Sequence, residues 1–206
     1  MERDRVDGVN ITGRFALGDG LVVLLHRDDG VMRSRDERRS LGRRLLADAA
    51  SILFGVDAAD VSVTARCVRC GADHGRPVLS VRGQSTEGTA SVSHAGTDTV
   101  VAVSTGVIGI DAEPVVGSAD RPVAIRTLLG PWAAQAADGP EALEAWTVVE
   151  SVLKADGRGL ELDPGRVHVE GIGAGAGPRG TIDGTGASYR LSSTVVDGLV
   201  VTVAAG

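Results

Sequence analysis

Two helical patterns, separated by a long run of strand-like segments, constrain the fold of this 206-residue chain most. In residues 35–54 apolar side chains recur every three or four positions, and Gly55 follows as a helix end. A second helical pattern covers residues 141–156 and ends before Gly157. The order is helix followed by strands, twice over. The sequence therefore predicts an α+β protein, a pseudo-two-fold pair of similar α/β halves, each a helix packed on a small antiparallel sheet.

Strands are predicted where short apolar or alternating runs are separated by glycine-rich turns. One or two strands are expected in residues 9–25, and a short helix is expected near 121–129 in an otherwise irregular stretch. We expect an N-terminal half at 1–113 and a C-terminal half at 114–206, with the active site at their interface, since clefts between halves are common ligand sites. The remaining predicted strands are 61–64, 78–81, 90–93, 99–104, 107–113, 167–170, 189–196 and 199–203.

Composition excludes several classes of protein. Aromatic residues are only 2%, so valine, leucine, isoleucine and alanine must build the core, and the net charge of −6 argues against general nucleic-acid binding. No run approaches the ~20 apolar residues of a membrane span, and no secretory signal is visible. Two cysteines exclude a disulfide framework. We therefore expect a cytoplasmic protein without a membrane or nucleic-acid partner.

Two carboxylates lie in the predicted strand at 107–113. Because alternate residues of a strand share a face, Asp111 and Glu113 point to one side, next to Gly109, whose missing side chain leaves room for close approach. Two carboxylates aimed at one spot repel each other unless a cation or a proton intervenes. Oxygen ligands suit a hard divalent cation. The alternative is a solvated strand end that carries two surface acids.

Glu150 and Lys154 are the only charged residues in the second half of the helix at 141–156, before Asp156 at its end. A surface pair at this i, i+4 spacing contributes only about 0.3–0.5 kcal/mol. Val148, Val149 and Val152 make this helix so apolar that we expect it to be largely buried, and a carboxylate and an ammonium that face a polar cleft fit such a helix better than an exposed pair does. Lys154 is also the chain's single lysine, where arginine serves at every other basic position.

Two further patterns have weaker interpretations. Cys67, Cys70 and His74 have spacing that suggests zinc, but no fourth ligand is evident in the sequence. The glycine-rich run at 171–177 mimics a dinucleotide fingerprint, but no helix follows it, so we predict a loop.

The segment from Trp146 to Leu160 resembles the W-[ST]-x-K-E-[AS]-x-x-K-A-x-G-x-G-L signature of the 4'-phosphopantetheinyl transferases. Four further segments in the same order resemble motifs of that superfamily, and together they are specific where each alone would be weak. The length resembles the large monomeric Sfp-type class. The four segments are Arg38-Arg39-Ser40-Leu41, His74-Gly75-Arg76-Pro77, Ser91-Val92-Ser93-His94-Ala95-Gly96 and Gly109-Ile110-Asp111-Ala112-Glu113.

The resemblance implies transfer of 4'-phosphopantetheine from coenzyme A to a serine of an acyl or peptidyl carrier protein, with release of 3',5'-ADP. It implies Mg²⁺ held by Asp111, Glu113 and Glu150, with Glu150 and Lys154 as the catalytic residues. Coenzyme A phosphates would be contacted by Arg39, Arg76, Ser93, His94 and Lys154.

The partners implied are coenzyme A and a carrier protein of polyketide, nonribosomal peptide or fatty-acid biosynthesis, and the protein would be a monomer. Val149 stands where the family usually has a lysine. An alternative is therefore a catalytically altered member that binds a carrier protein or coenzyme A without transfer, or that performs other chemistry on a carrier-bound intermediate.

Overall fold

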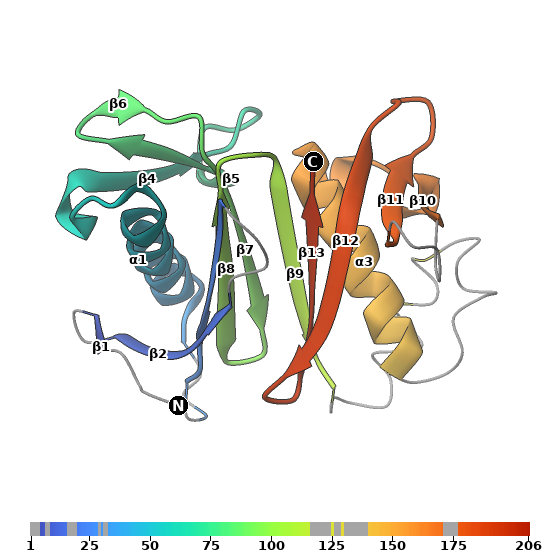
Figure 1. Ribbon diagram of the computed structural model, residues 1–206, viewed down its shortest axis with the longest axis horizontal. Coiled ribbons are helices and arrows are strands. Elements are labelled where there is room, and N and C mark those ends of the chain that lie inside the picture. The colour runs from blue at the N-terminus through green and yellow to red at the C-terminus, as the bar shows by residue number, and fades with distance from the viewer. Residues whose placement is uncertain are drawn as a thin grey trace. The chain divides into compact units, whose positions relative to one another are not determined.

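The computed structural model describes residues 5–6, 9–15, 20–28, 30, 33–115, 125, 129, 140–170 and 177–206. The chain divides into two compact units, Met1–Ile108 and Gly109–Gly206. Each unit holds one long helix and a five-stranded sheet, so the α+β prediction is confirmed (Figure 1). The strand with Asp111 and Glu113 belongs to the second unit, whereas the sequence placed it at the end of the first. That the two units repeat one fold, and that the active site lies at their interface, stay predictions.

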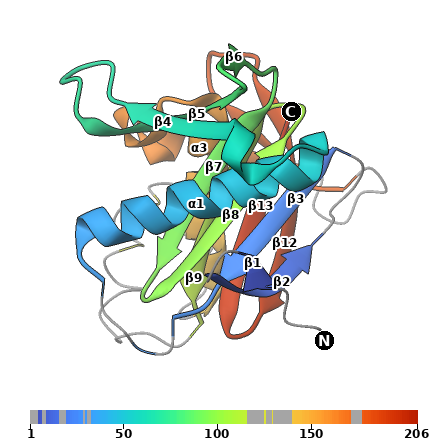
Figure 2. The same ribbon diagram turned by 90° about the vertical axis from the view of Figure 1, so that its left-hand side faces the viewer.

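The first unit contains two sheets with one helix, α1 (Arg35–Phe54). The larger sheet has the strand order β1-β2-β3-β8-β7, and the smaller sheet has the order β4-β5-β6; neighbouring strands are antiparallel in both. Helix α1 contacts β3 and β8 of the larger sheet and β4 of the smaller one, and Figure 2 shows it lying across β8. The strands are β1 (Arg5–Val6), β2 (Val9–Phe15), β3 (Leu21–His26), β4 (Val61–Arg66), β5 (Asp73–Val81), β6 (Gln84–Ser85), β7 (Thr89–Ala95) and β8 (Asp98–Ser104).

Helix α1 has the bounds that the sequence predicted because both of its ends carry strong signals. Ser34 is the N-cap of a capping box: its hydroxyl accepts from Glu37 N, and the Glu37 carboxylate accepts from Ser34 N at 2.8 Å. Gly55 ends the helix in the left-handed region, at φ 66°. The buried face of the helix packs in one apolar cluster with the sheets, whose members include Leu41, Leu45, Leu46, Ala49, Val22, Leu24, Leu79, Val101 and Val103.

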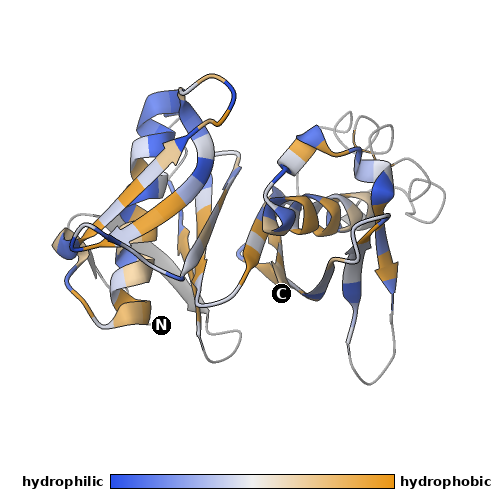
Figure 3. Cartoon of the chain, turned by 90° about the horizontal axis from the view of Figure 1, so that it is seen from above, coloured by the Kyte–Doolittle hydropathy of each residue, from blue (hydrophilic) through white to orange (hydrophobic). Residues whose placement is uncertain are grey.

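The second unit places helix α3 (Pro140–Asp156) on a sheet with the strand order β10-β11-β12-β13-β9. The pairings from β10 to β13 are antiparallel. Val149, Val152 and Leu153 are at most 1% exposed, which confirms that this helix is largely buried. The two long helices differ in hydropathy: Figure 3 shows that α3 is mostly apolar, while α1 is hydrophilic over much of its length. The strands are β9 (Ile108–Pro114), β10 (Val167–Glu170), β11 (Arg179–Ile182), β12 (Ser188–Val196) and β13 (Leu199–Ala205).

The predicted strands are all present, and several are longer than the sequence indicated. Strand β5 begins at Asp73 rather than at Val78. The apolar pattern missed its first half because that half carries charged and polar side chains. The sequence missed the two-residue strands β1 and β6 and did not delimit β11. The predicted loop at 171–177 lies outside the described residues except for Gly177. Of the predicted helix at 121–129, the structure describes Ile125 and Leu129, and Leu129 N donates to Ile125 O at 3.0 Å.

Two hairpins close through two-residue turns in which both residues have positive φ. These are Arg82-Gly83 between β5 and β6 and Asp197-Gly198 between β12 and β13. Such turns match the twist of the strands that they join and so set the register of the pairing. No helix among the described residues is long and apolar enough to cross a membrane.

Candidate functional site

Strand β9 is buried on both of its faces. Ile108, Ile110 and Ala112 are at most 2% exposed, as expected for residues that face the core. Asp111 and Glu113 are also buried, at 3% and 5% exposed. The interpretation of these two acids as a solvated strand end is therefore wrong.

Gly109 allows helix α3 to pack directly against β9. A Cβ atom at this position would lie 2.0 Å from the carbonyl oxygen of Ser151 and 2.4 Å from the backbone nitrogen of Ala155. Only glycine fits between the two backbones at this distance. The room for close approach that the sequence predicted beside Asp111 is thus filled by the backbone of α3, which brings Lys154 over the strand.

Lys154 joins the strand to its own helix. Its Nζ donates to Asp111 Oδ1 at 2.6 Å and lies 3.4 Å from Glu150 Oε2, one helical turn earlier. The side chain of Asp111 is 4% exposed, and those of Glu150 and Lys154 are 20% and 26% exposed. Asp111 and the pair of Glu150 and Lys154, which the sequence analysis considered separately, therefore form one charged cluster in the second unit.

The charges of this cluster shift one another's pKa values. Burial raises the pKa of Glu150, the negative charges of Asp111 and Glu113 raise it further, and the ammonium of Lys154 opposes them only in part. Burial by itself lowers the pKa of Lys154, but the carboxylates of Asp111 and Glu150 outweigh it, so this pKa is raised. Lys154 is consequently held as a cation, while Glu150 accepts a proton more readily than an ordinary glutamate.

Together with Glu113, whose charge also acts on Glu150, the cluster has three carboxylates against one ammonium and so an excess of negative charge. Oxygen donors of this kind suit Mg²⁺, so the donor set of Asp111, Glu113 and Glu150 fits the cation that the resemblance implies. The three carboxylates are not drawn together around one point in the structure: among the described ranges, only Cys67, Cys70 and His74 have ligand atoms that all lie within 4.8 Å of one another. Lys154 Nζ lies beside two of the carboxylates instead.

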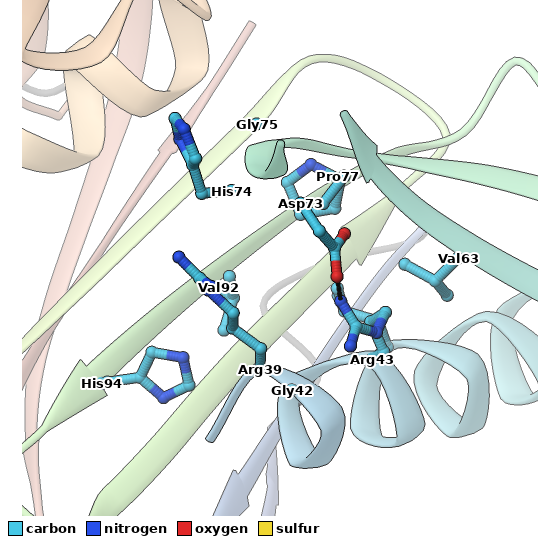
Figure 4. A pocket seen from close by; sticks show the side chains of 12 residues that line it. Arg39, Gly42, Arg43, Val63, Asp73, His74, Gly75, Pro77, Val92 and His94 are labelled. Carbon is cyan, nitrogen blue, oxygen red and sulfur yellow. Dashed lines mark hydrogen bonds and ion pairs between the residues drawn. The ribbon is translucent and has the colours of Figure 1, made fainter. Parts of the chain in front are cut away.

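A cavity of about 190 Å³ lies in the first unit, between α1, β4, β5 and β7 (Figure 4). This volume is below the ~300–1,000 Å³ of a pocket for a whole drug-sized ligand, so the cavity suits one end of a larger molecule. Arg39 and His94, which the sequence assigned to phosphate binding, both line it. His94 is held by Thr99, whose hydroxyl lies 3.0 Å from its Nδ1.

The other residues predicted to contact coenzyme A lie elsewhere. Gly75 and Pro77 line the cavity, but Arg76 between them is exposed and is not among the lining residues. Ser93 is buried on the opposite face of β7 from His94 and does not line the cavity either. Lys154 belongs to the carboxylate cluster of the second unit.

The cavity also contains residues that the sequence analysis did not assign to a site. Arg43 lines the cavity and forms an ion pair with Asp73 from β5 (Figure 4). Gly42 lies at the floor, where a Cβ would be 3.3 Å from Val92 Cγ2 and 3.6 Å from His94 Cε1. A glycine inside a helix costs about 1 kcal/mol relative to alanine. That glycine was the available signal that something approaches the helix closely at this point.

Comparison of the chain with protein-family models and with curated proteins found no match. The family resemblance therefore depends on the five sequence segments alone.

Proposed function

We propose that this protein transfers the 4'-phosphopantetheine group of coenzyme A to a serine hydroxyl of an acyl or peptidyl carrier protein. The single observation that carries the proposal is the cluster of Asp111, Glu150 and Lys154, in which a buried strand acid and a helix acid share one ammonium. The five family-like segments of the sequence support it. In the transfer, the serine oxygen forms a new bond to phosphorus and the bond to 3',5'-ADP breaks.

Glu150 is the proposed base for the serine hydroxyl. A base works best when its pKa lies near the working pH, and burial together with Asp111 and Glu113 raises the pKa of Glu150 in that direction. Lys154 is the proposed phosphate contact, since its ammonium is a compact cation with three donors, of which one is directed to Asp111.

Asp111, Glu113 and Glu150 would hold Mg²⁺, which when bound neutralises charge on the pyrophosphate. The cavity of the first unit has two arginines, Arg39 and Arg43, and the imidazole of His94, which suit a phosphate of coenzyme A. Arginine binds phosphate through two parallel hydrogen bonds, which fixes the orientation as well as the charge.

The test is intact-mass measurement of several apo carrier proteins incubated with coenzyme A, Mg²⁺ and this protein. Transfer adds the mass of one phosphopantetheine group to the carrier, and Glu150→Gln and Asp111→Asn should abolish that gain while the protein stays folded. Glu144→Gln, an exposed acid on the same helix, is the matched control and should transfer normally. The absence of a mass gain on every carrier tested would contradict the proposal. Tight carrier or coenzyme A binding without a mass gain would favour the altered, non-transferring relative.

A further inference from the structure

We propose that Cys67, Cys70 and His74 form a zinc site with three protein ligands at the end of the β4–β5 hairpin. The sulfur atoms of the two cysteines and one ring nitrogen of the histidine all lie within 4.8 Å of one another. This site is separate from the carboxylate cluster, and its existence does not depend on the proposed transfer activity. It takes a different class of metal, because thiolates and imidazole select zinc where carboxylates select magnesium.

The distances are close to what a zinc ion needs. The Cys70 sulfur lies 3.0 Å from His74 Nε2. A tetrahedral ion with Zn–S of about 2.3 Å and Zn–N of about 2.0–2.1 Å places neighbouring ligand atoms roughly 3.5–3.8 Å apart. Admitting the ion therefore takes a change of about half an ångström in this contact and of at most about an ångström in the two others, which side-chain rotation can supply.

The backbone between the two cysteines is already folded into a tight turn. Cys67 N donates to Ala72 O at 2.8 Å, and Gly71 N donates to Cys67 O at 2.9 Å. Gly71 has φ 69°, a conformation that few other residues adopt readily. The turn brings both thiols to one side of the loop, so part of the ordering entropy of the site is met before any metal binds.

Gly75 fixes this turn to the sheet. A Cβ there would lie 2.2 Å from the carbonyl oxygen of Arg66 and 2.8 Å from the backbone nitrogen of Cys67. The strand that carries His74 can therefore run directly against the residue that precedes the first cysteine. The register between β4 and β5 shifts at the same place, between Thr64 and Arg66.

The fourth position of the ion has no evident protein ligand in the neighbouring loop. Asp73 lies next to His74, but its carboxylate pairs with Arg43 of helix α1. We therefore expect a water molecule at the open position.

Zinc would have a structural consequence, because His74, Gly75 and Pro77 form one wall of the cavity that also contains Arg39 and His94 (Figure 4). Metal held by His74 orders this wall.

Metal binding to two thiols releases their two protons, so affinity falls as the pH is lowered. The test uses the full chain, reduced, freed of metal and titrated with Co²⁺ and then Zn²⁺. We expect one Co²⁺ per chain with a thiolate-to-cobalt charge-transfer band, its displacement by Zn²⁺, and zinc protection of both cysteines from alkylation. Slower amide exchange in residues 67–77 with zinc is expected from the ordering of the loop.

Cys70→Ser and His74→Asn should each weaken Zn²⁺ binding at least tenfold, whereas the matched control His168→Asn, a half-buried histidine of the second unit, should bind as the parent does. The proposal is overturned if the reduced chain gives no charge-transfer band and zinc leaves both cysteines open to alkylation. It is also overturned if metal binding survives Cys70→Ser unchanged. The proposal is likewise overturned, in favour of a redox pair, if the mass of the chain kept in reductant is lower by two hydrogens because Cys67 and Cys70 form a disulfide. Alkylation protection is measured on the parent chain, so the test stands even if a variant fails to fold.

Discussion

Asp111 Oδ1 accepts a hydrogen bond from Lys154 Nζ at 2.6 Å, which ties strand β9 to helix α3 through two charges that are mostly withdrawn from water. The same ammonium lies 3.4 Å from Glu150, so one cation compensates two carboxylates. Because the cluster has more acids than bases, the lysine is needed for stability as well as for any chemistry that the cluster performs.

Lys154→Met should lower the free energy of unfolding by about 3 kcal/mol, because removing one partner of a buried pair leaves the other charge uncompensated. Urea denaturation with and without the substitution measures this. The double variant Lys154→Met, Asp111→Asn should recover part of the loss, since the carboxylate that had lost its cation is gone. Equal stability of Lys154→Met and the parent would contradict the role given to this pair.

Lys154→Arg separates charge from shape. The guanidinium keeps the positive charge but is planar and larger than an ammonium, so it does not fit the same contact with Asp111. We expect transfer activity to fall at least tenfold with a smaller loss of stability than in Lys154→Met. Full activity in Lys154→Arg would mean that any cation serves at this position.

Gly109→Ala should be strongly destabilising, because the added methyl group would lie 2.0 Å from the Ser151 carbonyl oxygen and must push α3 away from β9. Overpacking of this kind costs about 1–3 kcal/mol or more. The contrasting variant is Gly42→Ala, where the nearest atom is a valine methyl at 3.3 Å and helix propensity offsets the crowding. Thermal unfolding of the two variants should give a large fall in Tm for Gly109→Ala and a small change for Gly42→Ala; the reverse order would refute this account of the strand–helix packing.

Val149 stands where the family signature has a lysine, and its side chain is fully buried in the apolar cluster of the second unit. Val149→Lys should therefore reduce stability by more than about 2 kcal/mol, since the ammonium would enter an apolar environment. Val148→Lys is the matched control, because the neighbouring valine is only partly buried and a lysine there can reach water. Chemical denaturation measures the free energy of unfolding of both variants, and equal values would contradict this interpretation.

Asp28 and Arg33 give the first unit a contribution to stability that depends on pH. The hydrogen bonds from Arg33, one of them 3.1 Å long, lower the pKa of Asp28. Its folded-state pKa is thus below the value of about 3.9 for an unfolded chain. The stabilisation is present above that unfolded-state pKa and is lost as the pH falls through the folded-state pKa.

Asp28→Asn should accordingly make the fall of Tm below about pH 4 less steep than in the parent. Asp36→Asn serves as the control, because Asp36 is 93% exposed and its contact with Arg39 is 3.4 Å long. A parent-like acid profile in Asp28→Asn would show that this ion pair does not contribute.

Local signals in the sequence were sufficient for helices α1 and α3 and for most of the strands that the structure describes. The capping box at Ser34 and Glu37 and the glycine at position 55 set the ends of α1, and apolar periodicity identified α3 as a buried helix. The same periodicity could not delimit β5, whose first half is polar and is held by pairing with β4 rather than by burial of its own side chains.

The sequence by itself determined the two helices, the strand with alternating Asp111 and Glu113, and the spacing of Glu150 and Lys154, because each depends on residues close together in the chain. Only the tertiary structure decided that both strand acids are buried, that Lys154 joins Asp111 to Glu150, and that Cys67, Cys70 and His74 converge. The physical reason is the same in each case. Burial, pairing and pKa depend on which backbones approach one another, and here glycines at positions 75 and 109 allow approaches that no local pattern specifies.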